Sequence, residues 1–274
     1  MKKQMYDLIV PLGANCGASM WLRSLELQHA SYPFDWVTGV NFQTKADLLL
    51  RDCKGYCELD DLEFLVKKSG DYNDSHCDYY KSKKHGVSFY HDFPAGVPLT
   101  TSYPAVSHKY ARRITRLYED IRRAERVLVF WFTRIEQTTD ETVVKFQREL
   151  TRKFGKEIDL LTVEHDPSKE NTDRVEKTEP APHVVRYKMD TNTPAEATYQ
   201  VYGNARLIEP ILRHYGRNRS LTQRICSAVK GPLVRLASLA VLDKAKRKTF
   251  RRKYFPEYQY RKNLREIHKA LRKK

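Results

Sequence analysis

The stretch that decides the fold is VPLGANCGASMWLR, residues 10–23. It overlaps the end of an apolar run, YDLIVPL at 6–12, whose pattern is typical of a buried strand that feeds a glycine turn. A helix is predicted next, because apolar residues recur along 20–27 and the chain then reaches Pro33. The chain is therefore expected to start as a strand, a turn of small residues that contains Cys16, and a helix.

Strand-like and helix-like segments alternate through the rest of the first two thirds of the chain. Beyond 6–12, the predicted strands are 87–90, 126–133, 158–163 and 183–189. The predicted helices after the first are 45–53, 60–68, 107–123, 139–154 and 204–215, and the polar segments 69–84 and 166–182 are predicted loops. Such alternation predicts an α/β fold: a mostly parallel sheet flanked by helices in three layers.

The positive charge of the chain is concentrated at its C-terminal end. The formal net charge is +16, yet residues 206–274 alone contain 21 Lys or Arg and 4 Asp or Glu. The preceding residues contain 29 bases and 30 acids, so they are nearly neutral. We therefore predict an α/β domain over 1–215, which carries a cysteine and histidine site, and a basic amphipathic helical tail over 216–274.

The tail has the features of an interfacial helix. Residues 221–242, LTQRICSAVKGPLVRLASLAVL, place apolar side chains near one helical face. Aromatic residues lie among the bases that follow, at Tyr254, Phe255, Tyr258 and Tyr260. This combination favours an anionic membrane surface as the partner. Ordinary packing on the α/β domain is the alternative, and nucleic acid is disfavoured because no recognisable binding motif is present.

The cysteines indicate a reducing compartment. The five cysteines, Cys16, Cys53, Cys57, Cys77 and Cys226, are odd in number and irregular in spacing, unlike a secreted disulfide framework. No apolar run reaches the ~18 residues of a membrane span, and no signal segment is evident. We expect a cytoplasmic protein that is peripheral at the inner face of a membrane.

A metal site is not expected from these cysteines. Cys53 and Cys57, followed by His76 and Cys77, have an irregular spacing for zinc ligands. Neither a metal nor an organic cofactor is therefore predicted for the chain.

Cys16 has two interpretations. Near the first turn of a helix, the thiol would meet the positive end of the helix dipole, which lowers a thiol pKa and favours the nucleophilic thiolate. Asn15, or the N–H groups beside Cys16 such as that of Gly17, would then stabilise a developing oxyanion. The alternative is a buried structural thiol at a tight crossing, where small residues permit close packing.

Four blocks of sequence, in order, carry a resemblance to a known family. They are LGANC at 12–16 with Leu22-Arg23, SYPFDW at 31–36, FYHDF at 89–93 and KYARRI at 109–114. Together they cover roughly the first half of the chain, and an ordered set is far more specific than one block. The set resembles DUF1796, a bacterial family of unknown function described as papain-like cysteine peptidases. Its members resemble proteins found with surface-polysaccharide and glycan-modifying genes.

The resemblance implies a cysteine nucleophile with a histidine partner. Residue by residue, Cys16 becomes the nucleophile and His91 the general base, while Asp92 or Asp35 orients the imidazole. His91 follows a strand-like run and precedes an acid, which favours it over the other histidines of the first half. For Asp35, capping of a backbone turn is an equally good interpretation.

Two arginines of the last block are candidate substrate-binding residues. Arg112 and Arg113 either bind an anionic group of the substrate or solvate a helix face, and runs of charge more often do the second.

The order of elements departs from papain, because a strand precedes the cysteine helix. That order is more similar to SGNH-type hydrolases, and GANC with YPFDW is weakly similar to the GSCFA domain. However, no histidine of the chain has an aspartate three residues before it, so the SGNH triad is not expected.

Together these observations predict a cysteine-dependent acyl-transfer enzyme, a hydrolase of the papain-like peptidase kind. A surface-polysaccharide or glycan acyltransferase or esterase at the membrane surface is the first alternative. A non-catalytic protein that binds an anionic glycan or nucleotide is the second. The residues leave open whether water or another acceptor takes the acyl group.

Overall fold

The computed structural model describes residues 3–67, 77–135, 137–192, 200–255 and 257–272. The first half of the predicted loop at 69–84, which includes His76, therefore lies outside the described residues. The side chains of Cys226 and Tyr258 lie outside them as well.

The largest sheet has five strands in the order β2-β7-β8-β10-β9. Its strands are β2 (Leu8–Pro11), β7 (Val127–Phe132), β8 (Ile158–His165), β10 (Val184–Met189) and β9 (Val175–Ala181). Neighbouring strands from β2 to β10 pair in parallel, and β9 is antiparallel at the edge. All six residues of β7 are buried, as expected of a parallel strand covered on both faces.

Helices cover both faces of this sheet. Successive residues of a strand point to opposite faces. Val129 belongs to the cluster shared with α2 (Phe42–Leu50), α3 (Leu99–Arg123) and α4 (Asp140–Phe154). Leu128 belongs to the cluster shared with α1 (Gly17–Ser24) and α5 (Ala205–Leu212). A mixed α/β architecture is confirmed.

The strand that precedes β2 has a pairing partner of its own. β1 (Gln4–Tyr6) runs almost directly into β2 and pairs in parallel with β11 (Tyr215–Arg217). β1 and β11 form a separate two-stranded sheet, and β2 is an edge strand of the five-stranded sheet. In open α/β sheets, ligands bind outside the carboxyl ends of the parallel strands.

A second, antiparallel sheet has the order β3-β6-β5-β4. Its strands are β3 (Val37–Thr38), β4 (Leu62–Lys67), β5 (Cys77–Ser82) and β6 (Ser88–Pro94). The helix predicted at 60–68 is wrong: a short 3-10 turn, η1 (Leu59–Asp61), leads into β4. Short apolar runs fit either structure locally, and pairing with β5 decides for the strand.

Two predicted loops also contain strands. The end of the 69–84 segment forms β5, and the 166–182 segment contains η2 (Pro167–Lys169) and β9. Both strands are rich in charged residues, which locally resemble loop sequence. In β9 those charges suit an edge strand, because they discourage pairing with another chain.

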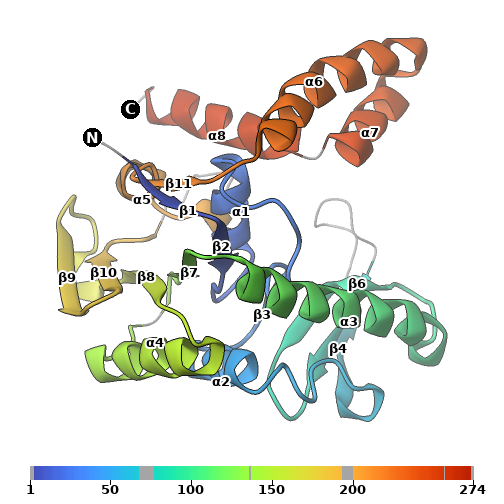
Figure 1. The fold of residues 1–274 in the computed structure, drawn as a ribbon. Coiled ribbons are helices and arrows are strands. Elements are labelled where there is room, and N and C mark those ends of the chain that lie inside the picture. The colour runs from blue at the N-terminus through green and yellow to red at the C-terminus, as the bar shows by residue number, and fades with distance from the viewer. Residues whose placement is uncertain (1–2, 68–76, 136, 193–199, 256, 273–274) are drawn as a thin grey trace.

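The basic C-terminal segment is helical. It contains α6 (Leu221–Ala237), η4 (Ser238–Ala240), α7 (Lys244–Tyr254) and α8 (Glu257–Leu271). A further 3-10 turn, η3 (Gln200–Tyr202), lies before α5. Figure 1 places α6 to α8 on one side of the molecule and α2 with α4 on the opposite side. α8 packs on α1, since Leu264 and Trp21 share a buried cluster. The division of the chain at 215/216 stays a prediction.

None of the described helices is both long enough and apolar enough to cross a membrane.

Candidate active site around Cys16

Cys16 lies in the turn between the end of β2 and the start of α1. It is the capping residue that precedes α1, with helical backbone angles (φ −65°, ψ −9°) and a partly exposed side chain. The turn that carries it follows the carboxyl end of β2. The thiol therefore occupies the position that α/β folds commonly use for ligand binding.

The small residues of this turn are required by packing. A Cβ added to Gly17 would lie 2.4 Å from the carbonyl oxygen of Val201, and one added to Gly13 would lie 2.6 Å from the Cβ of Ala18. Real Cβ atoms do not approach other heavy atoms so closely. Close packing therefore requires glycine at both positions, whether or not the Cys16 thiol reacts.

Asn15 organises the start of the helix. Its side-chain oxygen accepts a hydrogen bond from the N–H of Gly17 at 2.8 Å. This bond uses the N–H of Gly17, which is one of the groups predicted to stabilise an oxyanion. The amide nitrogen of Asn15 remains as the other candidate donor. The oxyanion roles of Asn15 and Gly17 stay predictions.

The electrostatics of Cys16 differ from the sequence-based expectation. Burial raises the pKa of the thiol, and the backbone at the helix start and the nearby Lys45 lower it by less. The net pKa is above the ordinary value, which is opposite to the lowered pKa that the nucleophile interpretation of Cys16 assumes. Desolvation outweighs the helix terminus because the sulfur is largely enclosed by protein.

Lys45 is a residue that sequence reasoning missed. It is fully buried in α2, its ammonium group donates a hydrogen bond to the carbonyl of Gly13, and it lies 5.9 Å from the ring centroid of Phe34. It is also the charged side chain that lowers the pKa of Cys16. Its position on the apolar face of the predicted 45–53 helix is the sequence feature that could have identified it as a buried lysine.

His91 lies in an irregular part of the antiparallel sheet. Asp78 pairs with Phe93 and Tyr80 with Phe89, so β6 has two more residues than β5 over this interval. Bulges of this kind re-aim side chains and are common beside active sites. The side chain of His91 is exposed. Its role as a base for Cys16 stays a prediction, since the two residues come from different sheets.

Asp92 is bound by helix α3. Its carboxylate accepts hydrogen bonds from the ammonium group of Lys109 and, at 2.9 Å, from the hydroxyl of Tyr110. Both carboxylate oxygens thus have partners on α3. Asp92 attaches β6 to this helix, and any role in orienting His91 would be additional.

Asp35 is the centre of a buried polar group that joins two of the sequence blocks. One of its oxygens accepts hydrogen bonds from Gln28 at 2.7 Å and from Arg23 at 3.2 Å. Burial raises its pKa, and Arg23 opposes that shift. The guanidinium of Arg23 also lies 5.7 Å from the ring centroids of both Trp36 and Tyr260. These contacts support a structural role for Asp35.

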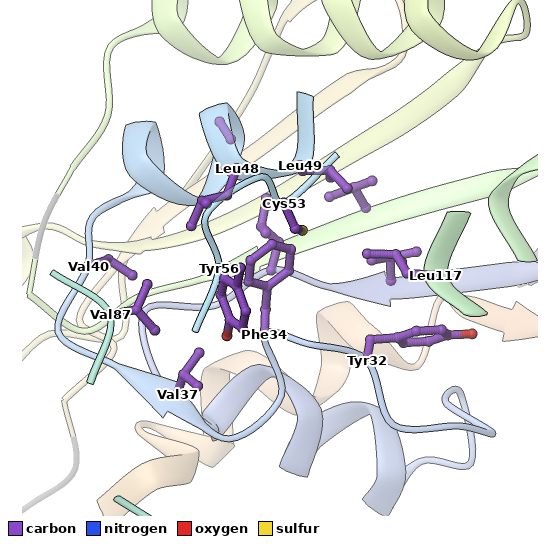
Figure 2. Close-up of a cluster of buried hydrophobic side chains, with 14 of the residues drawn as sticks. Tyr32, Phe34, Val37, Val40, Leu48, Leu49, Cys53, Tyr56, Val87 and Leu117 are labelled. Carbon is purple, nitrogen blue, oxygen red and sulfur yellow. The ribbon is translucent and has the colours of Figure 1, made fainter. Parts of the chain in front are cut away.

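Tyr32, Pro33 and Phe34 of the SYPFDW block are buried, whereas Ser31 and Trp36 are partly exposed. Figure 2 shows Phe34 beside Tyr56 and Cys53, below Leu48 and Leu49 of α2. The rings of Phe34 and Tyr56 meet edge to face at 5.8 Å. This packing explains why an aromatic segment accompanies the cysteine turn in the sequence.

Arg112 and Arg113 lie on α3. Arg112 is exposed and borders a surface hollow with His29, Arg116 and Asp120. The guanidinium of Arg113 lies 5.5 Å from the ring centroid of Tyr110. Their proposed contact with a substrate stays a prediction.

The parallel sheet places another histidine at its carboxyl edge. His165 ends β8 and is buried, with its Nδ1 atom 3.8 Å from Asp190 and its Nε2 atom 3.2 Å from Glu170. The side-chain nitrogen of Asn192 lies 3.3 to 3.4 Å from the ring nitrogens of His165, and Arg134 donates to the Asn192 oxygen at 3.4 Å.

Sequence reasoning passed over His165 although the signal was present. Like His91, His165 follows a predicted strand, here 158–163, and precedes an acid, here Asp166. Pro11, the last residue of β2, is level with Leu161 of β8, and His165 lies four residues further along; at the usual strand spacing and rise, the ends of the two strands are about 16 Å apart.

The fold and the Cys16 turn together define an α/β protein with a candidate thiol nucleophile at the carboxyl end of its first strand. The family model described as "Putative papain-like cysteine peptidase (DUF1796)" matches residues 7–167. This match covers more than half of the chain, and the chain belongs to that family. Both Cys16 and His165 fall within the matched region.

One relative is a viral protein of unknown activity. It is named "Uncharacterized protein R408", from Acanthamoeba polyphaga mimivirus, and is 30% identical over 122 residues. The alignment covers 40% of this chain and 55% of that protein, so the chain spans about half the length of this relative. No solved structure matches the chain. The bacterial, membrane and polysaccharide associations stay predictions.

Proposed function

We propose that the protein is a cysteine-dependent acyl-transfer enzyme, with Cys16 as its nucleophile and an ester, thioester or amide as its substrate. The observation that carries this proposal is the position of Cys16, a half-buried residue at the N-terminus of α1, beyond the carboxyl end of β2. Membership of a family described as papain-like cysteine peptidases supports a thiol hydrolase.

The proposed reaction has two steps. In the first, the Cys16 sulfur forms a bond to the acyl carbon while its proton passes to a base. The bond to the leaving group breaks, and the leaving group departs with a proton returned by that base. In the second step, water or another acceptor attacks the thioester and releases Cys16. Water makes the enzyme a hydrolase, and a sugar hydroxyl makes it a glycan acyltransferase.

A base is needed because the resting thiol keeps its proton. Burial raises the pKa of Cys16, so at neutral pH the attack requires removal of that proton. The buried ammonium group of Lys45 favours the thiolate as it forms. It would act as a positioning charge, and the proton acceptor would be a histidine.

Two histidines are candidates for this base. His91 is favoured by the family resemblance and by its place in a bulge of β6. His165 is favoured by its place at the carboxyl edge of the sheet that carries Cys16 and by its neighbours Asp190 and Asn192. An acid or amide beside a catalytic imidazole fixes its orientation, as in the known triads.

The test combines thiol alkylation with an acyl probe on the full chain. We expect iodoacetamide to modify Cys16 faster than Cys53 and Cys57, because burial raises the pKa of both of those thiols to about 12. We also expect p-nitrophenyl acetate to release about one equivalent of nitrophenol in a burst, which Cys16→Ala abolishes.

The base is identified by two variants and a control. Either His91→Ala or His165→Ala should remove the burst, by about 10²-fold or more in rate, while His29→Ala leaves it unchanged. A Cys16 that reacts no faster than Cys53, and a burst that survives Cys16→Ala, would contradict the proposal. The chain would then be better described by the second candidate, a protein that binds an anionic glycan or nucleotide without catalysis.

A further inference from the structure

The C-terminal helices expose a continuous row of aliphatic side chains, which we call the α6 stripe. Its residues are Ile225, Val229, Leu233, Leu236, Leu239 and Leu242. Their exposed fractions run from 47% to 91%, whereas the aliphatic side chains of the two core clusters are almost fully enclosed. Scattered exposed leucines are ordinary, but a contiguous apolar row marks an interaction surface.

Four residues of the stripe lie on a single face of α6, and Leu239 of η4 and Leu242 follow them in the chain. The first four members of the stripe are spaced by four, four and three residues, which keeps them on one side of an α-helix. Gly231 lies about 155° around the helix from the middle of the stripe, at about 100° per residue. That glycine is buried, and a Cβ added there would lie 3.1 Å from the ring of Phe255. The rest of the protein thus holds α6 by the face opposite the stripe.

Basic side chains flank the stripe on both sides. Lys230 lies about 105° from its middle in one direction, and Arg235 about 115° in the other. Both side chains are exposed. Long cationic side chains at the borders of an apolar face can keep their charge in water while their methylene groups cover apolar surface.

The neighbouring helices add further positive charge. Lys246 and Lys248 of α7 are exposed, and residues 206–274 as a whole contain 21 bases against 4 acids. The occupant of the stripe must therefore accept aliphatic side chains and also carry negative charge. A lipid surface with anionic headgroups does both.

Two other occupants fit these observations less well. A second copy of the chain would bring two strongly basic segments together, and like charges repel. Nucleic acid would satisfy the charge but would leave the aliphatic side chains in water, since it is bound through phosphates and through stacking on aromatic rings.

We propose that the α6 stripe lies in the interface of an anionic membrane, with Lys230, Arg235 and α7 on the headgroups. Figure 1 places α6 on the outside of the molecule, on the side away from α2 and α4. Membrane binding by this surface is independent of the proposed chemistry at Cys16, and either can hold without the other.

The experiment is sedimentation of the full chain with vesicles. We expect the chain to pellet with vesicles of phosphatidylcholine and phosphatidylserine at 7:3, and to bind at least tenfold more weakly to phosphatidylcholine alone. Leu233→Glu with Leu236→Glu should weaken binding to the anionic vesicles at least tenfold. Phe64→Glu, an equally exposed apolar residue on β4, is the matched control and should leave binding unchanged.

Three results would overturn the proposal. One is that the wild-type chain stays in solution with anionic vesicles. Another is that the Leu233/Leu236 variant, with an unchanged circular dichroism melting temperature, pellets as well as the wild type. The last is that the same variant converts a dimer into a monomer by sedimentation velocity while vesicle binding is absent. Alkylation of Cys16, measured in parallel, separates failure of this proposal from failure of the proposed function.

Discussion

The two main sheets of the molecule use their polar side chains differently. In the parallel sheet, β2 and β7 are buried along their whole lengths, and the candidate reactive groups Cys16 and His165 lie at or beyond strand ends. In the antiparallel sheet, His91 and Asp92 lie within a strand. In a parallel sheet covered on both faces, a substrate can reach side chains only near the strand ends, whereas an antiparallel sheet with one open face can expose side chains along a strand.

Each sheet is also joined to a covering helix by ion-paired side chains. In the parallel sheet, Arg186 of β10 bridges Glu164 of β8 and Asp140 of α4, and both Arg186 and Glu164 are fully buried. In the antiparallel sheet, Asp92 of β6 pairs with Lys109 of α3, whose side chain keeps about a quarter of its exposure. Because the ion pair of the parallel sheet is more deeply buried, removing its cation should lower the free energy of unfolding more than removing the cation of the antiparallel sheet.

The largest effect is expected for Arg186→Met. It leaves the buried carboxylate of Glu164 without its cation, and should lower the free energy of unfolding by about 3 to 5 kcal/mol. Urea unfolding measures this change. Arg186→Met with Glu164→Leu removes both charges and should recover most of the loss. A double variant that is no more stable than the single one would show that the pair itself, and not the orphaned charge, carries the energy.

A smaller loss is expected for Lys109→Met in the antiparallel sheet. Asp92 keeps its hydrogen bond from Tyr110, and water reaches the lysine, so the cost should be about 1 to 2 kcal/mol in the same urea measurement. If Lys109→Met costs as much as Arg186→Met, the proposed difference between the two sheets is wrong.

Lys45→Met tests the electrostatic environment at the end of β2. Removing the buried cation should raise the pKa of Cys16 further, and alkylation at pH 8 should slow about three- to tenfold, since one pKa unit is tenfold in thiolate. Lys54→Met, at an exposed lysine beyond the end of α2, is the control and should not change the rate. An unchanged rate in Lys45→Met would remove the lysine from the site.

The smallest effect is expected at the opposite edge of the parallel sheet. The Nδ1 atom of His183 donates a hydrogen bond to the carboxylate of Asp159 at 2.7 Å, and this contact raises the pKa of His183 above its ordinary 6.5. Protonation therefore favours the folded state. The stabilisation is complete below pH 6.5 and is lost as the pH rises through the folded-state value.

His183→Gln should accordingly reduce the free energy of unfolding at pH 5.5 by less than about 1 kcal/mol, because the pair is solvent-exposed. At pH 9 the variant and the wild type should have the same urea midpoint. A deficit that is equal at both pH values would mean that packing, not protonation, distinguishes them.

Much of the fold was predictable because periodicity is a local property. The continuous apolar runs in 6–12 and 126–133 predicted buried strands, and both are present as β2 and β7. The segment 60–68 was predicted wrongly because its apolar residues fit a helix as well as a strand. Only the partner β5, which comes later in the chain, decided between them.

The candidate site was predictable in position and less so in chemistry. The order of a strand, small residues, a cysteine and a helix located Cys16 correctly at the start of α1. Lys45 and His165 were missed because nothing in their own sequence neighbourhoods connects them with Cys16. Lys45 comes near the thiol through the packing of α2, and His165 shares its sheet edge through the strand order β2-β7-β8.

The sequence by itself determined where the first strand ends, which residues line the core, where Cys16 lies in the chain and which end of the chain is basic. These properties depend on residue type and on the spacing between residues that are close in the sequence. Tertiary structure decided the pKa direction of Cys16, the contacts of Asp35 and Asp92, and the exposure of the α6 stripe. Each of these depends on desolvation or on a partner distant in sequence, and both arise only when the chain is packed.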